Sequence, residues 1–151
     1  MIKLKSIIQE ILNEWHNSAK LEAHCEWDEN FELWSFLFYR NGRLAGQIRS
    51  ISPDDGYIIG FGVQRSLQGT GIGKAMLNYV FEKTNLPFVT LHSSANQFYH
   101  KIGGDRKGSQ FIIRREKIKP SSIKFQDIDK NKSDGYYNNP NQSFDNYPSI
   151  N

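Results

Sequence analysis

The stretch Tyr57-Ile58-Ile59-Gly60-Phe61-Gly62-Val63 is uncharged, and it is followed by Gln68-Gly69-Thr70-Gly71-Ile72-Gly73-Lys74 and then by Ala75-Met76-Leu77-Asn78-Tyr79-Val80-Phe81. This order predicts a strand, a glycine-rich turn and the start of a helix. Backbone N–H groups converge at such a turn, and the helix N-terminus adds a partial positive charge. The first functional hypothesis is therefore an anionic ligand that carries phosphate.

The spacing of the glycines disfavours two common phosphate-binding loops. A Walker loop needs G-x-x-x-x-G-K and then Ser or Thr, but Gln68 takes the first glycine position and Ala75 follows Lys74. A dinucleotide fingerprint needs G-x-G-x-x-G in a β-α-β unit, whereas this turn reads G-x-G-x-G after hairpin-like strands. Neither a nucleoside triphosphate nor a nicotinamide or flavin cofactor fits the pattern.

The turn instead resembles the acetyl-coenzyme A signature Q/R-x-x-G-x-G/A of the GNAT family of N-acetyltransferases, here at Gln68, Gly71 and Gly73. A second segment, residues 95–103, resembles the A-x-x-F-Y-x-K-x-G segment of that family. The resemblance covers residues 31–118. It implies an α+β fold, with a mixed and mostly antiparallel sheet flanked by helices, and acetyl-coenzyme A as cosubstrate. A glycine-rich turn without any ligand is the alternative.

The resemblance also implies roles for particular residues. Backbone N–H groups of Phe61 and Val63 are expected to bind the pantetheine arm and acetyl group, and Tyr99 is expected to donate a proton to the departing thiolate. A phenol suits this task because it keeps its proton at neutral pH; a purely structural tyrosine is the alternative. The expected pyrophosphate-binding residues are Gln68, Gly69, Thr70, Gly71, Ile72, Gly73 and Lys74.

The general base and the acceptor are not fixed by these residues. Presenting a lysine-like amine in neutral form at pH 7 costs about 4.6 kcal/mol, against about 1.4 kcal/mol for an α-amine. Many relatives carry a glutamate on the fourth or fifth strand, where this chain has none. The candidates are Asp55, Glu26, Glu32 and His92, or a chain of waters. Small amines, protein N-termini and lysines all remain open as acceptors.

The expected reaction is acetyl transfer to a primary amine by direct attack in a ternary complex. Cys25 alternates with Leu21, Ala23 and Trp27 and is expected in the core, which argues against a covalent acetyl-enzyme. The rival hypothesis is a module that binds coenzyme A or a protein without turnover. A net charge of +3 suits a polyanionic cosubstrate, whereas the basic residues between 101 and 119 fall short of a nucleic-acid track.

Length and composition predict one domain at residues 1–119 and an irregular, Asn-rich tail at 120–151. The tail contains Tyr136, Tyr137, Phe144 and Tyr147, so wrapping over its own domain or a partner and plain disorder both stay open. A homodimer is likewise open. With one cysteine and no paired ligand spacing, no disulfide and no metal site are expected. No signal peptide or membrane span is expected either, so a soluble cytoplasmic protein is the default.

The remaining elements follow from periodicity and turn signals. An amphipathic helix runs through Leu4 to Trp15, with Ser6 as N-cap and Gln9 completing a capping box. Asn41-Gly42 predicts a type I′ hairpin between strands 31–39 and 43–51. Further strands are expected at 21–27, 57–63, 88–91 and 111–117, and further helices at 71–84 and from Ser93 or Ser94 to Gly103.

Overall fold

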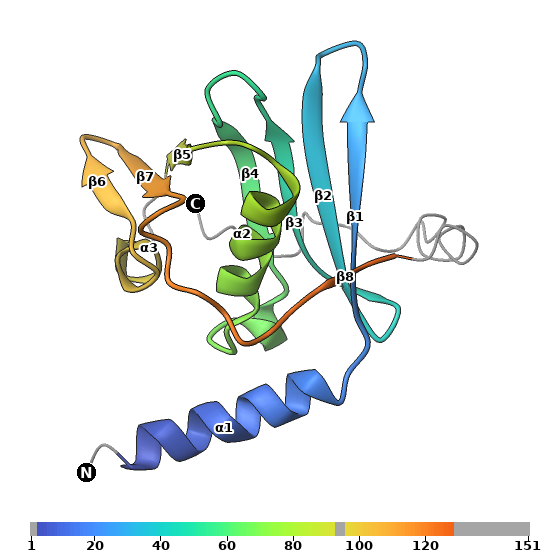
Figure 1. Ribbon diagram of the computed structural model, residues 1–151, viewed down its shortest axis with the longest axis vertical. Helices are drawn as coiled ribbons and strands as arrows, with labels where there is room; N and C mark the ends of the chain where they lie inside the picture. The colour runs from blue at the N-terminus through green and yellow to red at the C-terminus, as the bar shows by residue number, and fades with distance from the viewer. Residues whose placement is uncertain (1–2, 93–95, 129–151) are drawn as a thin grey trace.

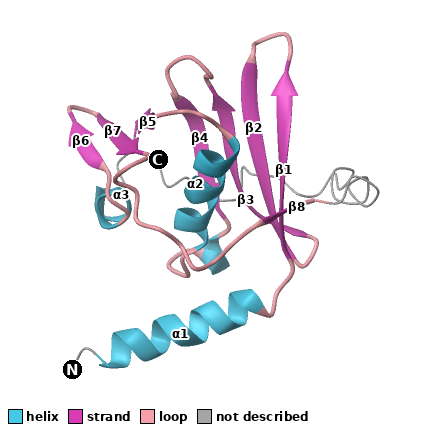
Figure 2. Ribbon diagram, viewed as in Figure 1, coloured by secondary structure: helices cyan, strands magenta, loops and turns pink. Residues whose placement is uncertain are grey.

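The computed structural model describes residues 3–92 and 96–128, whose arrangement is drawn in Figures 1 and 2. Mostly antiparallel strands and three α-helices give the α+β class expected from the sequence. The elements are α1 (Lys3–Asn17), β1 (Leu21–Asp28), β2 (Leu33–Arg40), β3 (Arg43–Ile51), β4 (Ile58–Val63), the 3-10 helix η1 (Arg65–Leu67), α2 (Ile72–Lys83), β5 (Phe88–His92), α3 (Asn96–Lys101), β6 (Asp105–Lys107), β7 (Gln110–Arg114) and β8 (Gln126–Asp127).

The predicted hairpin between β2 and β3 is confirmed. Arg40 pairs with Arg43 across the turn. Asn41 and Gly42 have φ values of 52° and 78°, the two positive values that a type I′ turn requires. This hairpin forms the middle of the larger sheet.

The described strands form two sheets that an isolated backbone bridge joins. The larger sheet has the order β4-β3-β2-β1-β8 and the smaller one β5-β7-β6. Between β4 and β5 the described residues make a single parallel bridge, Tyr57 with Thr90, supported by a hydrogen bond of 3.0 Å from the Thr90 N–H to the Gly56 carbonyl. Beyond the bridge the two neighbouring strands belong to separate sheets, so they diverge toward their carboxyl ends.

Helix α2 packs over the larger sheet in Figure 1 and supplies the centre of the core. Its side chains Ile72, Met76, Leu77 and Val80 have no solvent exposure. A Cβ on Gly46 of β3 would lie 2.8 Å from the Met76 sulfur, so the helix can approach β3 this closely only over a glycine. The start of α2 is thereby held beside the end of β4.

After β7 the chain crosses α2 and reaches the far edge of the larger sheet, as the orange segment of Figure 1 shows. The Asn78 side chain donates to the Lys119 carbonyl at 3.0 Å, and Ile123 and Phe125 are buried in the core. Strand β8 then pairs in parallel with β1. Residues 120–128 of the expected tail thus lie against the domain and include a two-residue strand that the sequence did not predict.

Residues 129–151 and their aromatic side chains lie outside the described residues, as do residues 93–95 with the expected start of α3. A domain boundary at 119/120 stays a prediction.

Two predicted details are wrong. Helix α1 is already formed at Lys3, so Ser6 lies inside it and is not its N-cap. Gln9 donates to the Asn13 side chain at 2.9 Å, one turn further along the helix. The last strand, predicted at 111–117, is β7, and it ends early at Arg114, whose carbonyl accepts the Lys117 and Ile118 N–H groups in a turn. Strand β6, which pairs with β7, was not predicted.

Helix α1 lies at one end of the molecule with its N-terminal part away from the sheets (Figure 1). Of its side chains only His16 is buried. Among the described residues, no helix combines the length and the apolar character needed to cross a membrane.

Candidate functional site

The end of β4 directs backbone amides toward the divergence between the two sheets. The Gln64 N–H donates to Ala45 of β3 at 2.8 Å, and the Gly62 carbonyl also faces β3. Because backbone groups alternate sides along a strand, the N–H groups of Phe61 and Val63 point away from β3, to the β5 side. Contact of these two N–H groups with the pantetheine arm and acetyl group stays a prediction.

The turn after β4 is held in shape by its own polar groups. The Gln68 side chain donates to the Val63 carbonyl at 3.1 Å, and the Thr70 hydroxyl donates to the Leu67 carbonyl at 2.5 Å. Gly69 and Gly71 have φ values of 78° and 94°, which only glycine adopts without strain. Gln68 thus bonds to the end of β4 and Thr70 to the turn itself, and a cosubstrate contact of either side chain stays a prediction.

The N-terminus of α2 presents a group of backbone donors. Its N-cap is Gly71, which has no side chain to cap the helix. Within the described chain, the N–H groups of Gly71, Ile72, Gly73 and Lys74 have no hydrogen-bond acceptor. Orphan amides and the helix dipole together suit an anion, and Lys74 in the first turn adds a formal positive charge.

Tyr99 on α3 lies beside β4. Its ring centroid is 6.1 Å from that of Phe61 and 5.2 Å from that of Phe111, and its side chain is fully buried. Phe98 packs between this cluster and the glycine-rich turn. A Cβ added to Gly73 would lie only 2.8 Å from the Phe98 ring, so the ring fills the space beside this glycine. Tyr99 therefore lies close to the end of β4, and its role as the acid stays a prediction.

Of the candidate bases, two lie where β4 and β5 meet. The Asp55 carboxylate accepts the Tyr57 N–H at 3.0 Å, and the His92 ring centroid lies 5.9 Å from that of Tyr57. Glu26 lies on β1, three places from β4 in the sheet, and Glu32 lies in the turn before β2. The structure therefore separates Glu26 and Glu32 from the divergence.

His92 has an identifiable tautomer. Its Nδ1 lies 3.2 Å from the Ser109 carbonyl oxygen. A carbonyl can only accept, so Nδ1 is the donor in this contact, and in a neutral ring Nε2 is then the acceptor. The ring is exposed at the end of β5 and can meet a substrate from solvent.

His16 is a residue near this site that the sequence analysis did not select. It has no solvent exposure, and neither ring nitrogen has a hydrogen-bond partner among the described residues. Burial and, to a lesser extent, the Arg40 guanidinium lower the pKa of His16, while the Thr70 backbone beside the ring partly offsets the change. Helix α1 thus reaches the glycine-rich turn through His16. A lone histidine in the last helical turn gives no sequence signal for such a contact.

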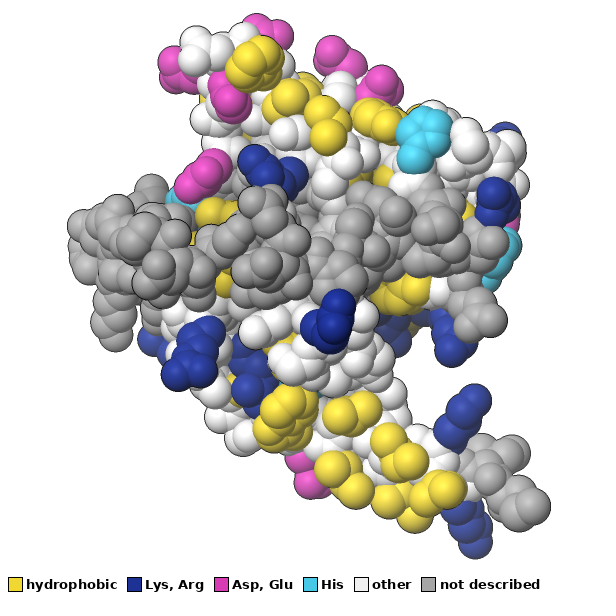
Figure 3. Space-filling model, turned by 180° about the vertical axis from the view of Figure 1, so that it is seen from behind, with side chains coloured by type: hydrophobic (Ala, Val, Ile, Leu, Met, Phe, Trp, Pro, Cys, Tyr) yellow, Lys and Arg dark blue, Asp and Glu magenta, His cyan; other side chains and the backbone are white. Residues whose placement is uncertain are grey.

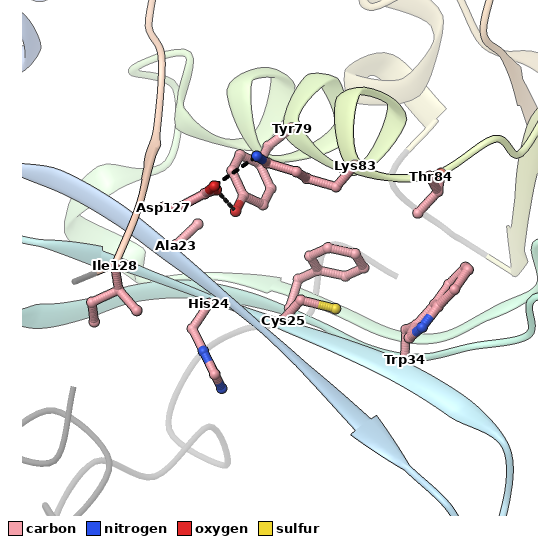
Figure 4. Close-up of a pocket in the computed structure, with 10 residues that line it drawn as sticks. Ala23, His24, Cys25, Trp34, Tyr79, Lys83, Thr84, Asp127 and Ile128 are labelled. Atoms are coloured by element: carbon pink, nitrogen blue, oxygen red, sulfur yellow. Dashed lines mark hydrogen bonds and ion pairs between the residues drawn. The ribbon is translucent and has the colours of Figure 1, made fainter. Parts of the chain in front are cut away.

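The expectation that Cys25 lies in the core is wrong. Its side chain has the predicted direction, on the same face of β1 as the buried Ala23, but it is exposed and lines an open cavity of about 410 Å³ (Figure 4). The core ends before Cys25 because α2 ends at Lys83. Partial burial, followed by the Glu26 carboxylate, raises the pKa of Cys25 to about 11, so the thiol is a poor nucleophile at neutral pH.

One wall of this cavity is polar. The Tyr79 hydroxyl and the Lys83 ammonium donate to the two oxygens of Asp127 at 2.5 and 2.8 Å, as the dashed lines in Figure 4 show. These bonds, from Lys83 first and then Tyr79, lower the pKa of Asp127. The cavity lies over β1 and β2, so it is separate from the divergence between β4 and β5. The Lys83 bridge joins α2 to the C-terminal segment.

Comparison with known proteins identifies the family. The model of the Acetyltransferase (GNAT) family matches residues 1–103, which include α1 to α3 and the whole glycine-rich turn. No curated protein matches the chain.

Proposed function

The chain belongs to the Acetyltransferase (GNAT) family, and from this premise we propose that it transfers the acetyl group of acetyl-coenzyme A to a primary amine by direct attack in a ternary complex. The main support is the pair of donor sets that meet at the end of β4. One set is the amides of Phe61 and Val63 on the strand, and the other is the unpartnered amides that open α2.

The opening of α2 suits the pyrophosphate of acetyl-coenzyme A. Four consecutive N–H groups, from Gly71 to Lys74, are available within the described chain. A Cβ on Gly69 would meet nothing within 4 Å, so the outer side of the turn has room for a large ligand. Amides that need no rearrangement before binding lose little entropy when the anion arrives.

The reaction needs three contributions from the protein: stabilisation of the developing oxyanion, a general acid and a general base. The amide of Phe61 or Val63 stabilises negative charge on the thioester oxygen as the amine nitrogen forms its bond to the carbonyl carbon. Tyr99 gives its phenolic proton to the sulfur when the C–S bond breaks. A base takes one proton from the attacking amine. All bonds and protons are then balanced without a covalent enzyme intermediate, in keeping with the high pKa of Cys25.

His92 is the base that the geometry favours. Its Nδ1 contact with Ser109 leaves Nε2 as the acceptor, and the ring lies at the junction of β4 and β5. Asp55 is the alternative at the same junction, but its Oδ1 already accepts the Tyr57 N–H. His92→Gln should lower kcat, whereas Asp55→Asn should leave kcat near its original value.

Tyr99→Phe tests the acid role. Because only the hydroxyl is lost, kcat should fall by about 10²- to 10⁴-fold while KM for acetyl-coenzyme A stays near its original value. Tyr79→Phe is the matched control, since it removes a hydroxyl that bonds Asp127 far from β4 and should leave kcat unchanged. Full activity of Tyr99→Phe with every amine tried would end the proposed acid role.

A binding module without turnover is the second candidate, and it is favoured by the lack of a carboxylate residue within strands β4 and β5 as the structure describes them. Calorimetry with acetyl-coenzyme A, followed by thiol-release assays on a panel of amines, separates the two. Binding with thiol release supports the enzyme; binding without release for any amine supports the module.

A further inference from the structure

Five large apolar side chains on α1 are exposed and form a stripe along one side of the helix. Their exposed fractions are Leu4 68%, Ile7 50%, Ile8 49%, Ile11 58% and Trp15 43%. The spacing of three and four residues places all five on one face. Figure 3 shows apolar side chains gathered on this helix. A contiguous exposed face of this kind marks a surface that another molecule covers.

The charges of α1 argue against a membrane as that molecule. Helices that lie on anionic membranes carry an excess of lysine and arginine beside their apolar face. In α1 the two lysines, Lys3 and Lys5, are balanced by Glu10 and Glu14, so the four charges sum to zero. A neutral helix gains little from an anionic lipid surface.

The positions of these charges instead match a second copy of the same helix. Lys3, Glu10 and Glu14 lie seven and four residues apart, on one flank of the stripe. When two identical helices pair in antiparallel orientation, the same flank of each faces the other, and Lys3 of one copy meets Glu14 of the other. The midpoint of Lys3 and Glu14 falls between Ile8 and Gln9, and the middle of the stripe falls at Gln9. One register therefore aligns the ion pairs and the apolar side chains together.

We propose that α1 pairs with α1 of a second copy, antiparallel about a two-fold axis near Ile8 and Gln9, and that this pairing covers the stripe. Such an interface is self-complementary, because each copy supplies the same side chains and each ion pair occurs twice. The exposure of the stripe leaves it accessible to a second helix, and α1 lies at one end of the molecule in Figure 1.

The size of the interface predicts a weak dimer. A standard interface uses about 20–30 residues from each partner, whereas α1 has 15 residues and offers five large apolar ones. Dimerisation should therefore depend on concentration. In sedimentation equilibrium from about 1 µM to about 1 mM, the mass should rise from the 17.5 kDa of one chain toward twice that value.

Ile8→Glu and Gln9→Glu form a matched pair of variants. Each adds one negative charge to an exposed site of α1, but only Ile8 lies in the stripe. The first variant should stay monomeric across the concentration range, and the second should dimerise as the original chain does. Far-UV circular dichroism and the urea midpoint verify that both remain folded.

A charge exchange tests the orientation. Lys3→Glu alone and Glu14→Lys alone should each weaken the dimer, because like charges then face each other across the axis. The double variant should restore the dimer, since antiparallel pairing again joins opposite charges. Parallel pairing would set this flank of each helix against the opposite flank of the other, so Lys3 and Glu14 would not meet and neither the single nor the double exchange would act through this ion pair.

Three results would overturn the proposal. The first is a mass of one chain at every concentration. The second is equal loss of the dimer in Ile8→Glu and Gln9→Glu. The third is failure of the double exchange to restore association. Binding of the original chain to phosphatidylserine vesicles that Ile8→Glu abolishes, with no dimer in solution, would assign the stripe to a membrane instead.

Discussion

At the scale of single residues, the glycines of the turn serve different physical purposes. Gly69 and Gly71 turn the backbone through positive φ, where a side chain brings strain. Gly73 has ordinary helical geometry, but the ring of Phe98 fills the space that its side chain would need. Two glycines therefore shape the backbone, and the third lets α3 approach α2.

This difference predicts different outcomes for two alanine variants. Gly69→Ala should cost about 1 kcal/mol of stability through backbone strain, because its Cβ meets nothing within 4 Å. Gly73→Ala should displace Phe98 and, through it, Tyr99, whose ring centroid lies 4.9 Å from that of Phe98. We expect kcat to fall about tenfold or more in Gly73→Ala, since small shifts of a catalytic group are costly. Steady-state kinetics and urea unfolding of both variants provide the comparison; equal kcat values would contradict it.

His16 predicts a pH dependence of stability. Burial, helped by Arg40, holds its pKa below 6.5 in the folded protein, so the unfolded chain binds this proton more readily. The free energy of unfolding should be unaffected above about pH 6.5 and should fall as the pH drops through that value. The slope from one such group is at most about 1.4 kcal/mol per pH unit. The loss ends once the pH reaches the folded pKa and the folded protein takes up the proton too.

His16→Leu should make this slope shallower between about pH 5 and pH 7, as measured by urea unfolding at a series of pH values. Burial also lowers the pKa of His24, which gives a loss of the same sign. The comparison is therefore made in a His24→Gln background. An unchanged slope in His16→Leu would show that His16 does not titrate abnormally.

At the scale of elements, the C-terminus of α2 is capped by a side chain from the far end of the domain. Arg115 follows β7 and donates to the carbonyls of Phe81, Thr84 and Leu86 at 2.6, 2.5 and 3.0 Å. Its guanidinium also lies 5.2 Å from the Phe81 ring centroid. One planar cation thus satisfies carbonyls that a helix end leaves without partners.

Arg115→Lys should lower the free energy of unfolding by about 2 kcal/mol, because an ammonium cannot reach all three carbonyls. Arg114→Lys is the control: Arg114 pairs with Asp105 on the surface, and that change should cost under about 1 kcal/mol. Chemical denaturation of both variants gives the comparison. If both variants lost the same free energy of unfolding, water would hydrogen-bond to the three carbonyls as well as Arg115 does.

At the scale of the whole molecule, the segment after Lys119 runs from α2 to β1 and packs against the core between them. It contributes Ile123, Phe125 and Ile128 as buried side chains. Burial of each is worth about 1.5–3 kcal/mol. Their sum approaches the total stability of a small domain, about 5–15 kcal/mol.

A chain ending at Lys119 should therefore be largely unfolded, whereas a chain ending at Ile128 keeps these contacts. Circular dichroism and urea midpoints distinguish the two, and Phe125→Ala in the full chain gives an intermediate loss of about 3–5 kcal/mol. If the chain ending at Lys119 unfolded at the same urea concentration as the one ending at Ile128, the segment would have no structural role.

Much of this architecture could be predicted because its signals are local. The dipeptide Asn41-Gly42 alone predicts the type I′ turn. The apolar run, the glycines and the helical pattern within residues 57–81 predict that β4 is followed by a turn and by α2. The relation of Tyr99 to Phe61 was available only through resemblance to a family, since no local pattern links α3 to β4.

What could not be predicted depends on distant contacts. Whether Cys25 is covered depends on where α2 ends, 58 residues later. Strand β8 has two residues and little apolar character, so only its partner β1 makes it a strand. The exposure of α1 was also missed: an amphipathic pattern predicts a buried face but does not identify the molecule that buries it.

The parallel pairing of β8 with β1 has a consequence for synthesis. Leu21 to Asp28 leave the ribosome about a hundred residues before Gln126 and Asp127 do, which at 5–20 residues per second is a delay of roughly 5–20 s. For that time β1 is a bare outer strand, and bare outer strands readily recruit other nascent chains. Glu22 on this strand and Lys20 just before it, which form an ion pair in the folded protein, put charged side chains at that edge, and charged side chains on an outer strand oppose such aggregation.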